Sequence, residues 1–282
     1  MMKTRDFFIC ATDLTVITGS NPYRDINEIY IKLWKKHFNK DYIKYINYLK
    51  NKNIKTKKEE TNIECIKRIA IENNLDLKKD INLESVLKTN NIEELNNHRD
   101  AILKKIKNKI PENVSKEFKE SFNSVINTNF GIKYENKGGE LYHTKTGNII
   151  TLDRKYHKKS VFDIDKDVWH FGGKVDGITE ICKEGVKTGC IIEIKNRVNR
   201  LFYTLKEYEK VQCYVYMFLL DIQKTHLCET LKSKDDSTLN IIEIDFDEIY
   251  WESILSKTEE FINDFYEFME NKKRKLEILK SA

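Results

Sequence analysis

The sequence predicts an α/β protein with a mixed central β-sheet flanked by helices, and with a helical insertion. The apolar, mostly β-branched run at 190–194 has the pattern of a buried strand, and the run at 239–246 repeats it. Apolar residues recur at helical spacing over 204–222. Residues 39–110 are rich in Lys, Asn and Glu, keep helical spacing and contain no motif. We therefore expect a single domain over 1–282, with 39–110 as an insertion-like helical segment.

Composition indicates a folded chain and limits its class. Hydrophobic residues make up 40% and aromatic residues 11% of the 282 residues, enough for a core, and two prolines and ten glycines argue against a linker-rich chain. The net charge of +5 is compatible with nucleic-acid binding but is not diagnostic of it. No window of about 18 uncharged apolar residues occurs, so no membrane span is expected.

The cysteines and the N-terminus indicate a reducing, intracellular compartment. None of the six cysteines forms a C-x-x-C pair, which argues against a zinc ribbon or an iron–sulfur cluster. Several lie inside apolar runs and resemble small buried hydrophobic residues. Charged residues at positions 3, 5 and 6 interrupt the start of the chain, so no signal peptide is expected.

Capping and alternation patterns predict the elements before the central region. Thr12 and Asp13 are expected to open a first helix, and Asp25 to open a second. A further helix is expected over 115–127. Residues 148–164 alternate between polar and apolar, which suggests two antiparallel strands.

The C-terminal third predicts strands followed by a long helix. Strands are expected at 225–230 and 239–246, separated by a polar turn at 232–237. A helix from Asp247 carries apolar residues at helical spacing and is expected to pack on the sheet. The basic run at 272–275 is expected to be a frayed tail.

Two carboxylates and a lysine are expected to meet near residues 176–195. The segment between Thr179 and Gly189 contains Gly185 and reads as a hairpin-like turn, which would return Glu193 next to Asp176. Because side chains alternate along a strand, Glu193 and the lysine two positions later share one face, opposite Ile192 and Ile194. The two carboxylates and Lys195 would then lie in one cleft.

This trio suggests a metal-dependent hydrolytic site. Two carboxylates at short range repel each other unless a cation lies between them, and hard oxygen ligands suit Mg²⁺ or Mn²⁺. Such a metal would activate a water and neutralise charge on a phosphodiester. Partial burial is expected to depress the pKa of Lys195, which would orient or deprotonate that water. The alternative is a surface hairpin with an ordinary Glu–Lys pair.

Asp176 and the run Glu193-Ile194-Lys195 resemble the PD-(D/E)xK nuclease superfamily, and the chain is more closely similar to the phage lambda exonuclease and YqaJ-type viral recombinase family. The resemblance covers 5–30 and 130–268 and implies a restriction-endonuclease-like core in 130–268. It implies that Asp176, Glu193 and the backbone carbonyl of Ile194 hold the metal.

Two further matches imply more site residues. Gly131, Glu135, Tyr142 and Thr146-Gly147 match the family's spacing, which implies that Glu135 lies on a helix beside the metal, as a ligand directly or through water. Gly138 and Gly139 depart from the pattern, and the helix is expected to be short or bent there. Gln212 matches a glutamine that faces the site, whereas Lys210 replaces the first glutamine of that motif.

The resemblance also implies DNA contacts. Arg5 and Thr12 match the arginine and the small hydroxyl residue that bind the 5′-phosphate of a DNA end. Arg197 and Arg200 follow the catalytic strand, where phosphate contact or a solvated loop are both open. Each of these interpretations has an alternative without a function. Arg5 and Thr12 would be a surface arginine beside an ordinary helix cap. Glu135 would be a solvated helix residue, and Gln212 a polar residue at a helix boundary.

The function implied is a Mg²⁺- or Mn²⁺-dependent deoxyribonuclease that degrades double-stranded DNA from its ends, 5′ to 3′, in viral-type recombination or replication. The resemblance implies a single-strand annealing protein as partner and a trimer as one oligomeric state. Two alternatives stay open. One is a sequence- or structure-specific endonuclease of the same superfamily, and the other is a non-catalytic DNA- or protein-binding module on a nuclease fold.

Overall fold

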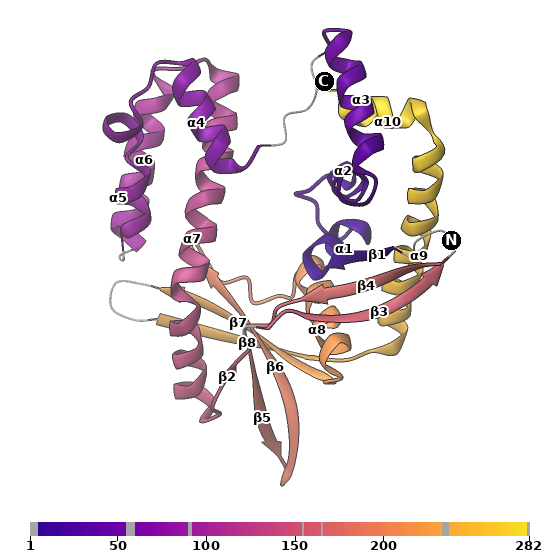
Figure 1. Ribbon diagram of the computed structural model, residues 1–282. Helices are drawn as coiled ribbons and strands as arrows, with labels where there is room; N and C mark the ends of the chain where they lie inside the picture. The colour runs from indigo at the N-terminus through magenta and orange to yellow at the C-terminus, as the bar shows by residue number, and fades with distance from the viewer. Residues whose placement is uncertain are drawn as a thin grey trace.

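The computed structural model describes residues 5–54, 60–89, 92–153, 155–164, 166–232 and 237–280. It confirms the expected fold class, an α/β arrangement of mixed β-sheets flanked by helices (Figure 1). The strands divide between two sheets, however, in place of the one central sheet that was expected. The polar turn expected at 232–237 falls in part outside the described residues.

The smaller sheet has three strands in the order β1-β4-β3. Its middle strand runs parallel to β1 and antiparallel to β3. Of the two strands expected within 148–164, one is long and belongs to this sheet, whereas the other has two residues and joins the larger sheet. The bounds are β1 (Asp6–Cys10), β2 (Thr151–Leu152), β3 (His157–Ile164) and β4 (Asp167–Gly173).

The larger sheet has five strands in the order β2-β5-β6-β7-β8. The central strand β6 pairs antiparallel with β5 and parallel with β7. The helix α8 connects the parallel strands β6 and β7. The strands expected near 225–230 and 239–246 are confirmed. The bounds are β5 (Gly177–Lys183), β6 (Val186–Arg197), β7 (Lys224–Lys232), β8 (Ser237–Asp245) and α8 (Glu207–Leu220).

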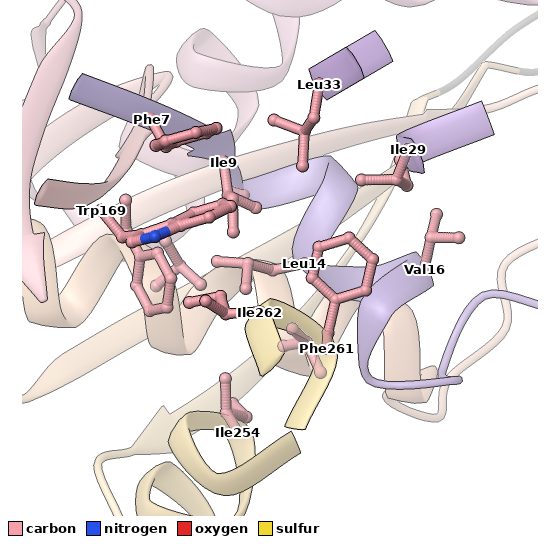
Figure 2. Close-up of a cluster of buried hydrophobic side chains, with 14 of the residues drawn as sticks. Phe7, Ile9, Leu14, Val16, Ile29, Leu33, Trp169, Ile254, Phe261 and Ile262 are labelled. Carbon is pink, nitrogen blue, oxygen red and sulfur yellow. The ribbon is translucent and has the colours of Figure 1, made fainter. Parts of the chain in front are cut away.

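The main core lies between the smaller sheet and the helices α1, α2, α8 and α9. Figure 2 shows part of it, where Phe7 and Trp169 come from adjacent strands and face Leu14 and Ile262. The Phe7 and Trp169 rings are stacked with their centroids 4.2 Å apart. The bounds are α1 (Ala11–Ile17), α2 (Ile26–His37) and α9 (Glu248–Glu270).

The capping signals were read correctly at two helices and incorrectly at one. Asp25 caps α2 and Asp247 caps α9 through their side chains, as expected. The first helix begins at Ala11, one residue before the expected start, so Thr12 and Asp13 lie inside its first turn. Asp13 is buried and paired with Arg24 and Lys32, so its carboxylate neutralises cations of the following segment and caps no helix.

The described residues within 39–110 are mostly helical, as expected, and many of them form a second core with the first half of α7. Figure 1 shows α4, α5 and α6 gathered around that half of α7. The helix α3 instead packs its Leu49 into the main core. The bounds are α3 (Asn39–Asn51), α4 (Asn62–Glu72), the π-helical turn η1 (Leu77–Ile81), α5 (Leu83–Lys88), α6 (Ile92–Lys107) and α7 (Glu112–Thr146).

The helix α7 is continuous over 35 residues, where a separate helix at 115–127 and a short or bent helix after 130 were expected. It runs through Gly138-Gly139 without interruption. A Cβ at Gly138 would lie 2.5 Å from Cγ2 of Ile194, so the missing side chain is what lets α7 approach β6. Packing against the sheet therefore outweighs the helix cost of about 1 kcal/mol per glycine.

We expect Gly138→Ala to lower the free energy of unfolding by up to about 2 kcal/mol. Overpacking against the stiff Ile194 side chain costs about 1–3 kcal/mol, and the better helix propensity of alanine returns about 1 kcal/mol. Gly139→Ala is the matched control, because its Cβ would meet only Cδ1 of Ile150 at an ordinary 3.6 Å. Urea unfolding checks both variants. Equal stability of the two would contradict this account of the close approach.

The basic run at 272–275 is helical and anchored, so the expected frayed tail is wrong. It opens α10 (Lys272–Leu279). Lys275 is only 4% exposed, pairs with Asp41 at 2.7 Å and lies over the Trp34 ring. Arg274 makes two hydrogen bonds to Asp264. The C-terminal helix thereby ties α9 to α2 and α3. No helix of the described residues has the length and apolar character of a membrane span.

A third core lies between α7 and the larger sheet, and it contains a buried histidine. Tyr142 and His226 are buried there, and the Tyr142 hydroxyl lies 2.8 Å from Nδ1 of His226. Nε2 of His226 has no hydrogen-bond partner, and burial lowers the pKa of the imidazole below its usual value of 6.5. The histidine is therefore neutral in the folded chain near pH 7.

Because His226 is buried in its neutral form, we expect the free energy of unfolding to fall on acidification. Because the folded-state pKa is depressed, the unfolded chain binds the proton first, so stability is complete above pH 6.5 and falls as the pH drops toward the folded-state pKa. The contribution approaches about 1.4 kcal/mol per pH unit. The difference in unfolding free energy between the wild type and His226→Gln should therefore shrink from pH 8 to pH 5. A constant difference across this range would count against the assignment.

Candidate metal centre

The β5–β6 hairpin brings Asp176 next to the end of β6, as the sequence predicted. The chain turns at Glu184 and Gly185, both with positive φ, whereas Gly189 lies within β6. The ladder ends with Gly177 opposite Ile192. One residue before it, Asp176 accepts a 2.7 Å hydrogen bond through Oδ2 from the backbone N–H of Ile194.

That hydrogen bond also orients the Ile194 carbonyl. In a strand, the N–H and C=O of one residue face the same neighbour. The Ile194 N–H points past the end of β5 toward Asp176, so its carbonyl lies on the same side, beyond the last β5 pair. A backbone oxygen is thus placed at the edge where the carboxylates gather.

The alternation along β6 separates polar from apolar side chains as expected. Ile192 and Ile194 pack into the third core. On the opposite face, Nζ of Lys195 lies 2.6 Å from Oε1 of Glu193 and donates to Oε1 of Gln212 at 3.1 Å. The Gln212 amide nitrogen in turn donates to Oε1 of Glu193 at 3.1 Å. A closed triangle therefore holds the carboxylate, the ammonium and the amide.

A tyrosine supports this triangle, although the sequence analysis did not identify it. Gln212 Nε2 also donates to the Tyr216 hydroxyl at 2.7 Å. The ring fits there because Gly173 lacks a side chain, since a Cβ would lie 2.6 Å from the Tyr216 ring. The available signal was the spacing, because residues four apart on a helix share a face.

A further site residue, Glu135, lies on α7. A hollow of about 290 Å³ is lined by Glu135, Asp176, Glu193, Lys195 and their neighbours. Asn196 ties α7 to this place, because its Nδ2 donates to the Gly131 carbonyl at 2.8 Å. The structure thus brings together all of the acidic and basic residues expected at the metal.

The hollow contains an unbalanced buried carboxylate. Glu193 is 3% exposed, and its Oε2 is buried with no hydrogen-bond partner. Burial raises the pKa of Glu193 despite the opposing charge of Lys195. Burial, the Glu193 charge and a side-chain hydrogen bond with Glu135 raise the pKa of Asp176 well above its usual range. These carboxylates cannot all ionise without a further cation.

The donor set fits a hard divalent metal. Carboxylate oxygens of Asp176, Glu193 and Glu135 and the Ile194 carbonyl are the ligand type that Mg²⁺ and Mn²⁺ prefer. The three carboxylates do not all approach within 4.8 Å of one another, so a cation would draw at least one side chain inward or reach it through water.

A second acidic group lies in the helical segment formed by α4, α5, α6 and the first half of α7, which we call the helical arm. Within the described ranges, only Glu60, Cys65 and Glu117 place their ligand atoms within 4.8 Å of one another. Arg68 already neutralises this group, because its guanidinium contacts both glutamates at 2.6 Å. The group is an ion-pair cluster in which the arginine occupies the place of a metal.

The expectation of a depressed pKa at Lys195 is wrong. Burial alone would lower the pKa, but the adjacent Glu193 carboxylate raises it above the usual value of 10.5. Lys195 is therefore an ammonium, which can donate hydrogen bonds and stabilise negative charge but cannot accept a proton from water.

The two arginines after the catalytic strand have different surroundings. Arg197 has a side chain that is 12% exposed, pairs with Glu209 at 2.8 Å and Glu229 at 2.7 Å, and lies over the Phe202 ring. Its charge is satisfied inside the protein. Arg200 lies three residues beyond the end of β6 and is exposed.

Arg5 and Thr12 do not come together. Arg5 precedes β1 and Thr12 follows it, and the five strand steps from Arg5 to Cys10 span roughly 17 Å at 3.3 Å per residue. Arg5 pairs with Asp167 and lies over the Phe38 ring, whereas Thr12 is exposed in the first turn of α1. The cation next to Thr12 is Arg24, whose Nη1 lies 3.4 Å from the Thr12 carbonyl.

No protein-family model matches the chain, and no curated protein matches it. Solved structures similar to it include an alkaline exonuclease from Laribacter hongkongensis, with a TM-score of 0.38, 16% identity and coverage of 68% of this chain and 89% of that one. The same exonuclease in complex with dAMP has a TM-score of 0.35 and 15% identity, with coverage of 68% of this chain and 89% of that one. The protein SSO0001 has a TM-score of 0.34 and 15% identity, with coverage of 70% of this chain and 83% of that one. Scores this low do not decide a function.

Proposed function

We propose that this protein is a divalent-metal-dependent deoxyribonuclease. The observation that carries the proposal is the buried Oε2 of Glu193, which lacks a hydrogen-bond partner and lines a hollow together with Asp176, Glu135 and Lys195. A buried carboxylate oxygen without a donor is costly unless a cation completes it. The arrangement of Asp176 with Glu193-Ile194-Lys195 also matches the motif of the PD-(D/E)xK nucleases.

The residues at the hollow would have different roles in phosphodiester hydrolysis. Asp176, Glu193 and the Ile194 carbonyl would hold Mg²⁺ or Mn²⁺, with Glu135 beside them. When bound, the metal supplies Lewis acidity toward the phosphodiester and lowers the pKa of a water. Lys195 is held by Glu193 and Gln212, so its ammonium is positioned to donate to the attacking water or to a phosphate oxygen. Gln212 fixes this geometry, because both ends of its amide are occupied.

We propose, from the sequence resemblance, that the substrate is the end of double-stranded DNA, degraded 5′ to 3′ inside a cell during recombination or replication. A single-strand annealing protein and a ring-shaped trimer belong to the same proposal.

A second candidate is an endonuclease of the same superfamily. The separation of Arg5 from Thr12 favours it, because the two residues proposed to bind a 5′-phosphate do not form one site. The third alternative, a non-catalytic module, is disfavoured because the expected catalytic residues gather at one place: Glu135, Asp176, Glu193 and Lys195 line the hollow, and Gln212 contacts Lys195.

Digestion of three DNA substrates in Mg²⁺ separates these candidates. Linear duplex with a 5′-phosphate, linear duplex with a 5′-hydroxyl and a closed circle would be incubated with the wild type and with Lys195→Ala. Loss of the linear substrates alone, abolished in the variant and by EDTA, is expected for an exonuclease. Cutting of the circle would establish an endonuclease, and no metal-dependent cutting of any substrate would refute the proposed function.

A further inference from the structure

The helical arm carries a basic groove next to the candidate metal centre. It is a hollow of about 550 Å³ between α6 and the start of α7, closed on one side by Asn199 from the segment after β6. We call it the arm groove. Four of its lining residues are basic and one is acidic, and they are Arg99, Lys104, Lys107, Lys119 and Asp100.

The positive charge of the arm groove is largely uncompensated. Arg99 contacts Asp100 through Nε at 2.9 Å. The Nη1 and Nη2 groups of its guanidinium can still donate hydrogen bonds to a ligand. Within the described part of the chain, Lys104, Lys107 and Lys119 are exposed and make no ion pair with a carboxylate. Three surplus cations concentrated in one groove create a local field that attracts a polyanion.

The arm groove and the metal hollow lie at successive turns of α7. Ser115, Lys119 and Asn123 line the arm groove, and Thr128, Gly131 and Glu135, further along the helix, line the metal hollow. Asn123 and Thr128 are five positions apart, which corresponds to about 8 Å at 1.5 Å per residue. The two hollows are therefore neighbours along α7.

The opposite wall of both hollows is also shared. Asn196 and Arg197 at the end of β6 line the metal hollow, and Asn199 lines the arm groove. Because Asn196 donates to the Gly131 carbonyl at 2.8 Å, α7 and the end of β6 are joined between the two hollows. The 16 positions from Lys119 to Glu135 span about 24 Å at 1.5 Å per residue.

We propose that the arm groove binds the sugar-phosphate backbone of the nucleic acid whose scissile phosphate lies at the metal centre. This inference rests on the proposed function. Duplex DNA carries one phosphate per about 3.4 Å on each strand, so the 24 Å along α7 from Lys119 to Glu135 matches the length of about seven base pairs. The helical insertion is thus a substrate-binding arm of the nuclease.

A charge-reversal variant tests the arm groove. Lys104→Glu, Lys107→Glu and Lys119→Glu would be combined, and binding to a labelled 20-base-pair duplex would be followed by fluorescence anisotropy in Ca²⁺ at several salt concentrations. Each lost lysine–phosphate contact reduces the slope of log K against log salt by about 1. We expect at least about 10-fold weaker binding, and a slope smaller by about 3.

Two further variants keep the test decisive. The matched control reverses three exposed lysines on α3 and α10, Lys44, Lys272 and Lys273, and should bind as the wild type does. If the charge-reversed arm misfolds by circular dichroism, replacement of its three lysines by glutamine is expected to give the same loss of slope.

The outcomes distinguish this inference from the proposed function. If the wild type binds and cuts DNA while the arm variant keeps its affinity and slope, or if arm and control variants weaken equally, the arm groove is not a DNA site and the nuclease proposal stands. If the wild type neither binds nor cuts DNA, the proposed function fails, and the arm inference fails with it. Binding of an acidic protein but not of DNA would also overturn the inference.

Discussion

Glu193→Gln is expected to abolish divalent-metal binding at the hollow and to reduce DNA cleavage by at least about 10³-fold, which corresponds to about 4 kcal/mol of transition-state stabilisation. The substitution keeps the size of the side chain but removes the charge of a buried carboxylate whose Oε2 has no partner among the described residues. It also removes the anion that holds Lys195. Calorimetric titration with Mn²⁺ and digestion of linear duplex DNA measure the two effects.

Glu180→Gln is the matched control for this prediction. Glu180 lies on the adjacent strand β5, is 70% exposed and makes only a surface ion pair with Lys187 at 3.4 Å. Metal affinity and cleavage should be unchanged in this variant. Retention of both activities in Glu193→Gln, with a native circular dichroism spectrum, would place the metal elsewhere.

Arg197→Met is expected to lower the free energy of unfolding by about 3–5 kcal/mol. Its guanidinium balances Glu209 and Glu229, whose side chains are 1% and 0% exposed, so its removal leaves two uncompensated buried carboxylates. Arg200→Met removes the same charge from an exposed position and should change stability by less than about 0.5 kcal/mol. Urea unfolding at pH 7 compares the two variants.

A rescue variant tests the cause of this loss. Adding Glu209→Gln and Glu229→Gln to Arg197→Met removes the buried charges together and should recover much of the lost stability. If Arg197→Met were instead as stable as the wild type but bound DNA more weakly, Arg197 would be a phosphate contact and not part of a buried ion-pair cluster.

The elements that local signals control could be predicted from the sequence. The β5–β6 hairpin follows from a β-branched run and a glycine turn, and the start of α2 follows from Asp25. The continuous α7 could not be predicted, because it depends on packing. Gly138 weakens a helix locally, but it is the residue that allows contact with Ile194 from a strand 56 positions later.

In the candidate site, too, residues placed by local signals could be predicted and residues placed by distant contacts could not. Asp176 and Glu193 follow from alternation and hairpin geometry, which act over short distances. The Arg5–Thr12 pair depends on the conformation between them, since seven residues span about 10 Å in a helix but more than 20 Å in a strand. The segment forms β1 because its side chains are buried against Trp169, a contact that lies far along the sequence.

The supporting residues were harder to identify. Tyr216 and Asn196 belong to no motif, and their roles depend on which helix lies beside which strand. The ion pairs of Arg197 likewise require β6, β7 and α8 to be placed side by side. A pattern in sequence alone contains no information about these neighbours.

The most direct test of the central claim is anomalous diffraction from crystals soaked in Mn²⁺. We expect one or more peaks in the hollow between Asp176 and Glu193, in contact with Oε2 of Glu193 and with the Ile194 carbonyl, and no such peak in Glu193→Gln. A fully occupied manganese site elsewhere, with none in this hollow, would contradict the proposal that these residues form the metal centre of a nuclease.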